Sequence, residues 1–227
     1  MPRRTLKRLT KTTAARKGGD AALEEMLAAY RSKSAAEIAA TPDDRLLASM
    51  ARQAFQAGFS WKVIETKWPG FEAAFDGFDV NACAFPSEEK FDALLKDTRI
   101  VRNARKIMSV QTNARFLLEL AQESGSAARF FAGWPDADEV GLLEVLKARS
   151  SGMGGESAMR FLRGLGKPSF ITSRDVTAAL IRDGVLEKPP SGKRDMARVQ
   201  AAFNEWSKQS GRDLTAISRV LAMSVGV

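Results

Sequence analysis

The chain has 227 residues, enough to form one large domain or two small lobes around a substantial core. One cysteine and no histidine exclude an intramolecular disulfide, the usual Cys/His zinc sites and catalysis by Ser-His or Cys-His pairs. A formal charge of +8 indicates a polyanionic partner. We find no long apolar run and no secretory signal at the start, and expect a cytoplasmic protein without membrane contact.

Much of this charge lies at the beginning of the chain. Residues 1–20 hold seven basic residues and one acidic residue, a net +6 of the total +8. We expect a disordered basic tail there, and a single helical domain over residues 21–227. The tail can bind DNA phosphates, act as a solubilising leader, or belong to an organelle transit peptide, and the sequence leaves these alternatives open.

Apolar residues recur at helical spacing almost to the end of the chain, and alternating strand patterns are scarce. The sequence therefore predicts an all-α fold. Cap residues with Pro42 and Pro86 mark two helix starts, and the Pro/Gly-rich stretch 188–192 is typical of a loop. The expected helices are 20–31, 34–40, 43–57, 60–67, 70–75, 79–84, 87–95, 98–106, 107–123, 125–131, 137–148, 155–165, 172–183, 194–209 and 212–224.

The first informative segment is 53–61, QAFQAGFSW, which is followed by KWPGFEAAFDGFD at 67–79. A helix ends at Gly58, Ser60 caps the next one, and the turn presents Trp61 beside the end of the first helix. Such a corner could stack on a planar ligand. Aromatic residues at helical spacing are more often part of a core, so this segment alone indicates little.

Two further stretches follow this segment and extend the pattern: IVRNARKI at 100–107 and NAR at 113–115. In order and spacing, residues 45–120 resemble the DNA-3-methyladenine glycosylase I family of the helix-hairpin-helix DNA glycosylase superfamily. The resemblance implies an all-α fold with two helical lobes around a base-binding cleft.

The second informative segment is SSGMGGESA at 150–158. A glycine-rich turn at a helix start exposes backbone N–H groups, and the helix dipole favours an anion such as a DNA phosphate. The turn is similar to the hairpin of helix-hairpin-helix glycosylases, which places the motif at about 137–165. The residues expected to contact DNA are Gly152, Gly154, Gly155, Ser157, Arg149 and Arg102.

The third segment, GKPSFITSRDV at 166–176, brings an aspartate to the start of a helix. Asp175 lies nineteen residues beyond Glu156, similar to the spacing of the superfamily's catalytic aspartate. The alternative is that Asp175 only stabilises its helix terminus.

Three departures from the family pattern bear on the chemistry. Glu156 stands where bifunctional members carry a Schiff-base lysine, so the resemblance implies a monofunctional enzyme. The family's zinc clip of Cys and His near the chain ends has no counterpart, so no metal or cofactor is expected. Gln53 occupies the family's glutamate position, and an amide can hydrogen-bond a base but cannot act as a general base.

The sequence therefore predicts a monomeric, monofunctional DNA glycosylase that flips an alkylated purine out of double-stranded DNA and hydrolyses its glycosidic bond. Trp61, with Phe55 or Tyr30, would stack on the base, Gln53 would hydrogen-bond it, and Asp175 would face the sugar.

Two alternatives stay open. One alternative is a catalytically impaired protein that binds damaged DNA on the same scaffold. Such a protein would also carry Gln53 in place of the glutamate. The other alternative is an all-α interaction module with protein partners and a basic tail.

Overall fold

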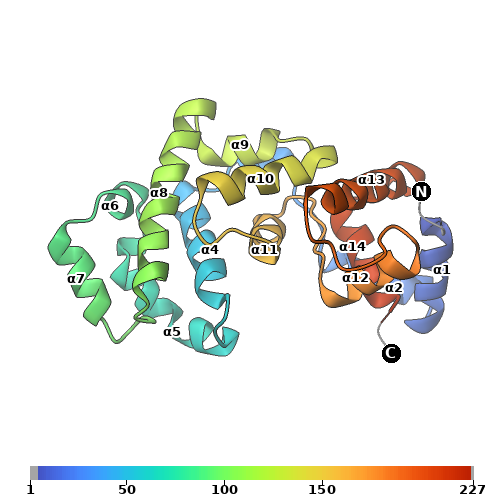
Figure 1. Ribbon diagram of the computed structural model, residues 1–227, viewed down its shortest axis with the longest axis horizontal. Coiled ribbons are helices and arrows are strands. Elements are labelled where there is room, and N and C mark those ends of the chain that lie inside the picture. Colours follow the sequence, from blue (N-terminus) through green and yellow to red (C-terminus); the bar gives the residue numbers. More distant parts are fainter. Residues whose placement is uncertain (1–4, 226–227) are drawn as a thin grey trace. The chain divides into compact units, whose positions relative to one another are not determined.

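The computed structural model describes residues 5–225, and these contain helices but no β-strand (Figure 1). The predicted all-α fold is confirmed. Where the sequence predicts a single domain, contacts divide the chain into two compact units. Within the described residues, the first comprises 5–33, 135–142 and 166–225, and the second comprises 34–134 and 143–165. No helix within residues 5–225 is long and apolar enough to cross a membrane.

The described part of the first unit contains five complete α-helices and a 3-10 turn, and three aromatic side chains form the centre of its core. Phe203 stacks on Phe170 at 4.7 Å between ring centroids and meets Trp206 edge-on at 5.7 Å. All three side chains are fully buried. The elements are α1 (Leu6–Arg16), α2 (Asp20–Ala28), η2 (Asp136–Asp138), α12 (Arg174–Arg182), α13 (Lys193–Ser210) and α14 (Leu214–Met223).

For the described residues from Thr5 onward, helix α1 corrects the prediction of a disordered tail over residues 1–20; residues 1–4 of that prediction lie outside the described residues. Leu6 and Leu9 lie one helical turn apart and are both buried, and α1 packs against α2, α13 and α14. Thr5 caps the helix, because its side chain accepts a hydrogen bond from the Arg8 amide. Burial of this narrow apolar stripe stabilises a segment whose composition is otherwise typical of disorder.

The second unit surrounds α8, which packs against α4, α6 and α9 (Figure 1). Its elements are α3 (Ala35–Ala39), α4 (Asp43–Gln56), α5 (Trp61–Ala74), η1 (Asp76–Phe78), α6 (Val80–Ala84), α7 (Glu88–Lys96), α8 (Ala104–Ser124), α9 (Ala127–Gly133) and α11 (Glu156–Leu165). Helix α10 (Glu139–Arg149) begins in the first unit and belongs to the second from Leu143 onward.

Two helix boundaries differ from the prediction. Helix α5 continues through Pro69, where a break is expected. Trp68, directly before it, stacks on Phe71 and Phe78 with ring centroids 5.5 and 5.4 Å away, so this part of the helix is held by packing. Helix α8 is a single helix that begins only at Ala104, because the Asn103 side chain accepts the Lys106 amide and caps it.

Candidate functional site

The corner predicted from residues 53–61 lies at the end of α4 in the second unit. Gly58 has φ +78°, a left-handed conformation that suits glycine, and it turns the chain so that α5 begins at Trp61. The Trp61 side chain is 52% exposed. Gln53, on the last turn of α4, is half-buried, and its amide has no hydrogen-bond partner among residues 5–225. The corner therefore presents an indole ring and a free amide.

One face of Trp61 is covered by a residue that no sequence motif singles out. The Arg160 guanidinium on α11 lies 5.3 Å from the Trp61 ring centroid, within the range of a cation–π interaction. Glu156, one turn earlier on α11, accepts a hydrogen bond from Arg160 at 2.7 Å. The Glu156–Arg160 pair thus supports the indole from one side. In the sequence, the i, i+4 spacing of the two residues is the only signal that predicts their ion pair.

Phe55 is not available to a ligand, and its predicted base-binding role is wrong. Its side chain is fully buried and meets Phe71 edge-on, with ring centroids 4.6 Å apart. Successive residues of a helix point in different directions, so Gln53 and Phe55 cannot both face outward here.

The glycine-rich hairpin between α10 and α11 needs its glycines for two different reasons. Gly152 has φ +77°, and a Cβ there would lie 3.0 Å from the Ala54 Cβ, so the turn packs directly on α4. A Cβ on Gly154 or Gly155 would instead meet open space, and the amides of these two residues have no hydrogen-bond partner among residues 5–225. Unpaired amides ahead of a helix can bind an anion.

A buried asparagine holds this hairpin in place. Asn113 on α8 is fully buried, and its Nδ2 donates to the Ser151 carbonyl at 3.0 Å. The Ser151 amide donates to Asn113 Oδ1 at 2.7 Å. Asn113, a residue of the NAR stretch of the sequence resemblance, therefore has a structural role.

Lys106 gives the IVRNARKI stretch a similar structural role. Its Nζ donates to the Ala54 and Ala57 carbonyls, both at 2.5 Å, and so caps the end of α4 beside the corner. Burial lowers the pKa of Lys106. A cavity of about 340 Å³ next to it extends to Ser151 and Gly152 of the hairpin.

The two arginines predicted to contact DNA differ in their surroundings. Arg102 is exposed and makes no ion pair with the described residues. Arg149 is paired with Glu119 at 3.1 Å and Glu123 at 2.5 Å, and its hydrogen bond lowers the pKa of Glu123. A phosphate would have to compete with two carboxylates for Arg149, whereas Arg102 is free.

Asp175 and Tyr30 belong to the first unit. Asp175 is the second residue of α12 and is exposed, and Ser173 caps this helix by accepting the Val176 amide. Tyr30 is 45% exposed, and the Arg219 guanidinium lies 3.8 Å from its ring centroid. Like Trp61, this ring has one face covered by an arginine.

The extended segment ahead of α12 is fixed by side-chain acceptors in the same unit. The Ser169 amide donates to Thr215 Oγ1 at 3.0 Å, and the Phe170 amide donates to the buried Glu139 carboxylate at 2.9 Å. These bonds satisfy backbone groups that have no partner in a regular element, and so position the start of α12.

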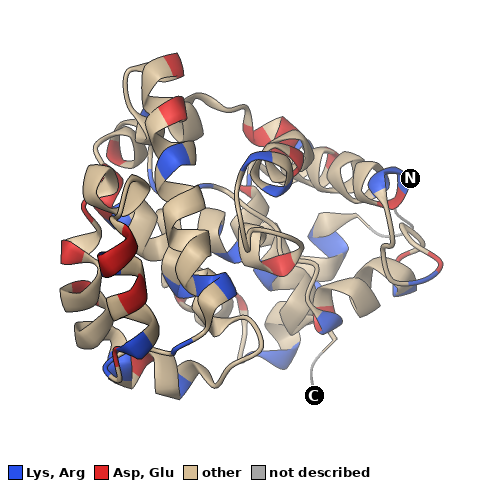
Figure 2. Ribbon diagram, turned by 60° about the vertical axis from the view of Figure 1, so that its left-hand side comes forward, with Lys and Arg blue, Asp and Glu red and all other residues tan. Residues whose placement is uncertain are grey.

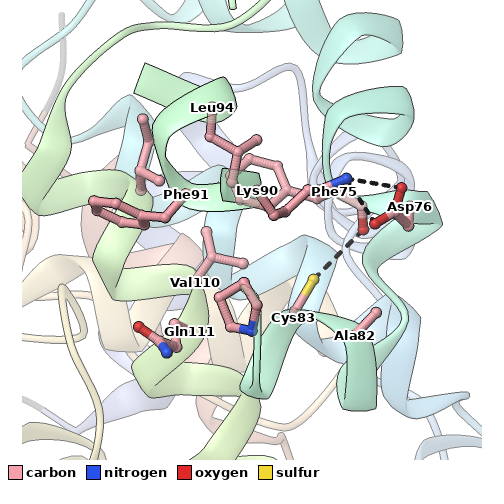
Figure 3. A pocket seen from close by; sticks show the side chains of 11 residues that line it. Phe75, Asp76, Ala82, Cys83, Lys90, Phe91, Leu94, Val110 and Gln111 are labelled. Atoms are coloured by element: carbon pink, nitrogen blue, oxygen red, sulfur yellow. Dashed lines mark hydrogen bonds and ion pairs between the residues drawn. The ribbon is translucent and has the colours of Figure 1, made fainter. Parts of the chain in front are cut away.

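Cys83 has the properties of a core residue. Its thiol is buried and donates to the Phe75 carbonyl at 3.4 Å beside a cavity of about 20 Å³, room for one water molecule (Figure 3). Burial, with the nearby Asp76 and Asp79 carboxylates, raises the pKa of Cys83 to about 12. A thiol that resists ionisation, in a chain without histidine, does not fit the zinc clip of the resembled family.

The all-helical architecture, the aromatic corner at the end of α4 and the glycine-rich hairpin fit the fold of a helical DNA glycosylase. Residues 24–144, more than half of the chain, match the methyladenine glycosylase family. The chain belongs to this family. The match ends within α10, so α11 and Asp175 lie beyond it.

The relatives include DNA-3-methyladenine glycosylase 1 of Escherichia coli (strain K12), 32% identical over 82 residues. That alignment spans 36% of this chain and 44% of the relative, less than half of its length. Among solved structures, a mutant of 3-methyladenine DNA glycosylase I in complex with 3-methyladenine covers 55% of this chain and 77% of its own, with 22% identity and a TM-score of 0.50. A mutant of 3-methyladenine DNA glycosylase I from Staphylococcus aureus covers 66% and 85%, with 20% identity and a TM-score of 0.50. These two likenesses support the fold.

Proposed function

We propose that this chain is a monofunctional DNA glycosylase that releases 3-methyladenine or a similar alkylated purine from double-stranded DNA. The observation that carries the proposal is the 52% exposure of the Trp61 ring, at the corner where α4 gives way to α5, within a segment that matches the methyladenine glycosylase family. The E. coli relative and the solved structures carry this activity in their names.

Trp61 is the stacking platform for the flipped base. Arg160 covers one face of the indole, so a base stacks on the other face, and the 52% exposure of the ring leaves room for it. Stacking of a base on an aromatic side chain contributes about 1–3 kcal/mol. The Gln53 amide supplies a donor and an acceptor for the edge of the base, which can distinguish one lesion from another.

The hairpin binds the DNA backbone. The free amides of Gly154 and Gly155 precede α11, and the helix dipole adds to their attraction for a phosphate. Ser157 and Arg102 extend this contact, while Arg149 contributes only if it leaves its two glutamates.

The chemistry is hydrolysis of the N-glycosidic bond. Water forms the new bond to C1′ of the sugar and releases a proton to bulk solvent, the bond from C1′ to the base breaks, and the base departs with the electron pair. Asp175 stabilises the positive charge that develops on the sugar, an electrostatic effect of about 3–4 kcal/mol. Glu156 provides no amine for an imine, so the DNA strand stays uncut.

We also propose that the protein acts as a monomer in the cytoplasm and without a metal. The absence of histidine supports the last point, because imidazole is the ligand that a zinc clip most needs here.

The test is release of bases from methylated genomic DNA, separated and identified by chromatography. Trp61→Ala should lower the rate of base release about 10- to 100-fold, in line with the loss of one stacking contact. Phe85→Ala is the matched control, because Phe85 is 69% exposed and also lies under an arginine, Arg115, at 5.4 Å. Equal rates for the two variants would contradict the role of Trp61.

A second candidate function is binding of damaged DNA without base release, and Gln53 favours it because an amide cannot serve as a general base. Asp175→Asn separates the candidates. A glycosylase should lose about a hundredfold or more in rate and keep its affinity for abasic DNA, whereas Gln53→Ala should alter mainly the choice of lesion. A wild-type protein that binds abasic DNA but releases no base would establish the second candidate.

A further inference from the structure

Helix α1 has one basic face and one buried face. Leu6, Leu9 and Thr13 are buried in the core of the first unit, while Lys7, Arg8 and Lys11 are exposed on the opposite side. The helix, of sequence LKRLTKTTAAR, holds no acidic residue. Figure 2 shows the Lys and Arg positions of the ribbon in blue and the Asp and Glu positions in red. Its polar face is therefore a fixed row of cations on a folded element.

The charges of this row are not neutralised within the protein. Lys7, Arg8 and Lys11 make no ion pair and no side-chain hydrogen bond with any residue from 5 to 225. Neighbouring arginines are engaged: Arg16 donates to the Ser224 carbonyl at 2.8 Å, and Arg212 pairs with Glu24. The exposed row thus remains available to an external anion.

The row borders a groove that suits a phosphodiester chain. The groove has a volume of about 650 Å³ and runs between α1 and the end of α13. Lys7, Lys11 and Arg212 line it together with hydroxyl groups of Thr5, Thr10 and Ser210. Among the described residues of the lining, Asp20 is the single acidic residue, against three basic ones. Lysine and hydroxyl side chains are the groups that proteins commonly direct at phosphate oxygens of DNA.

We propose that the groove between α1 and α13 is a second DNA-binding site, which binds the sugar–phosphate backbone without regard to sequence. The proposal rests on the proposed function for the identity of the polyanion. A membrane surface fits less well, because an interfacial helix inserts its apolar face into lipid, and the apolar face of α1 is buried in the protein.

The test measures binding of an undamaged 30-base-pair duplex by fluorescence anisotropy between about 50 and 300 mM salt. The Lys7→Gln/Lys11→Gln variant should reduce the slope of log K against log salt by about 1.8, because each lost phosphate contact removes about 0.9. The Lys96→Gln/Lys188→Gln variant is the matched control, since both lysines are exposed and the same charge is removed. This control should keep the wild-type slope.

An equal reduction in both variants would show an effect of net charge alone and overturn the proposal, as would an unchanged slope in the α1 variant. The proposal would also be overturned if the Lys7→Gln/Lys11→Gln variant lost binding to phosphatidylserine vesicles but kept its binding to DNA, because the groove would then be a membrane-binding site. Base release at saturating DNA should be the same in all three proteins. If none of them releases a base while the slopes still differ, the proposed function fails and the second DNA-binding site stands.

Discussion

Replacement of Asn113 by alanine offers a quantitative test of how the hairpin is held. The carboxamide exchanges two hydrogen bonds with the Ser151 backbone, at 2.7 and 3.0 Å, and the side chain is fully buried. Each bond contributes about 1 kcal/mol net, and the part-buried Ser151 amide and carbonyl left behind add a desolvation cost. We expect Asn113→Ala to lower the free energy of unfolding by about 2–4 kcal/mol.

Urea denaturation measures this loss. With a slope of about 2 kcal/mol per M, the midpoint should fall by about 1–2 M. Hydrogen exchange of the Ser151 amide should also become more than about tenfold faster, because its acceptor is gone. Asn81→Ala serves as the control, since Asn81 is exposed and its side chain makes no hydrogen bond with residues 5–225.

Asn113→Asp separates the two bonds. The aspartate keeps an acceptor for the Ser151 amide, but its second oxygen faces the Ser151 carbonyl, which is also an acceptor. The variant protein should therefore become more stable as the pH falls, because the protonated carboxyl can donate to that carbonyl. A midpoint for Asn113→Ala no lower than that of Asn81→Ala would refute the reasoning, because the hairpin would then be held by other contacts.

Four further predictions concern Cys83, the glycines of the hairpin and Glu156. The pKa of Cys83 is raised from its ordinary value of 9.0 to about 12. At pH 8 the thiol should therefore react with Ellman's reagent about a thousandfold more slowly in the folded than in the unfolded protein. Fast labelling of the folded protein would contradict the burial of Cys83. The same shift should make the fold less stable as the pH rises from 9 toward 12, since only the unfolded chain then releases the thiol proton. Gly152 has φ +77°, and a Cβ there would lie 3.0 Å from the Ala54 Cβ, whereas a Cβ at Gly154 would meet open space. Gly152→Val should therefore weaken DNA binding more than Gly154→Val. Equal affinities of the two variants in an anisotropy titration would argue against the packed turn. Borohydride during the reaction should trap no covalent DNA adduct, because the sequence resemblance places Glu156 where bifunctional members carry the Schiff-base lysine. A trapped species on a denaturing gel would reveal another active amine.

The sequence determined those features that depend on residue type and local spacing. Helical periodicity is set by 3.6 residues per turn, so the all-α fold and most helices could be predicted from the apolar pattern. The corner with Gln53 and Trp61 also followed from local signals, since Gly58 ends a helix and Ser60 precedes the next. The absence of histidine excludes whole classes of catalysis from composition alone, because no arrangement of the chain can supply an imidazole base.

Only the tertiary structure decided which side chains meet. From the sequence, Phe55 is a candidate to stack on the base together with Trp61. In the structure α4 turns Phe55 into the core against Phe71, and α11 brings Arg160 onto Trp61. Likewise, Asn113 and Ser151 are 38 residues apart, and no local pattern predicts their pair of hydrogen bonds.

The difference between local sequence signals and tertiary contacts also explains why α1 was not predicted as a helix. Its many cations and few apolar residues are typical of a disordered segment, because two leucines alone cannot offset the entropy of ordering a helix. Leu6 and Leu9 become sufficient only when α2, α13 and α14 supply a surface on which they are buried. Burial depends on which distant segments fold together, and that information is spread over the whole chain rather than held in any one stretch of it.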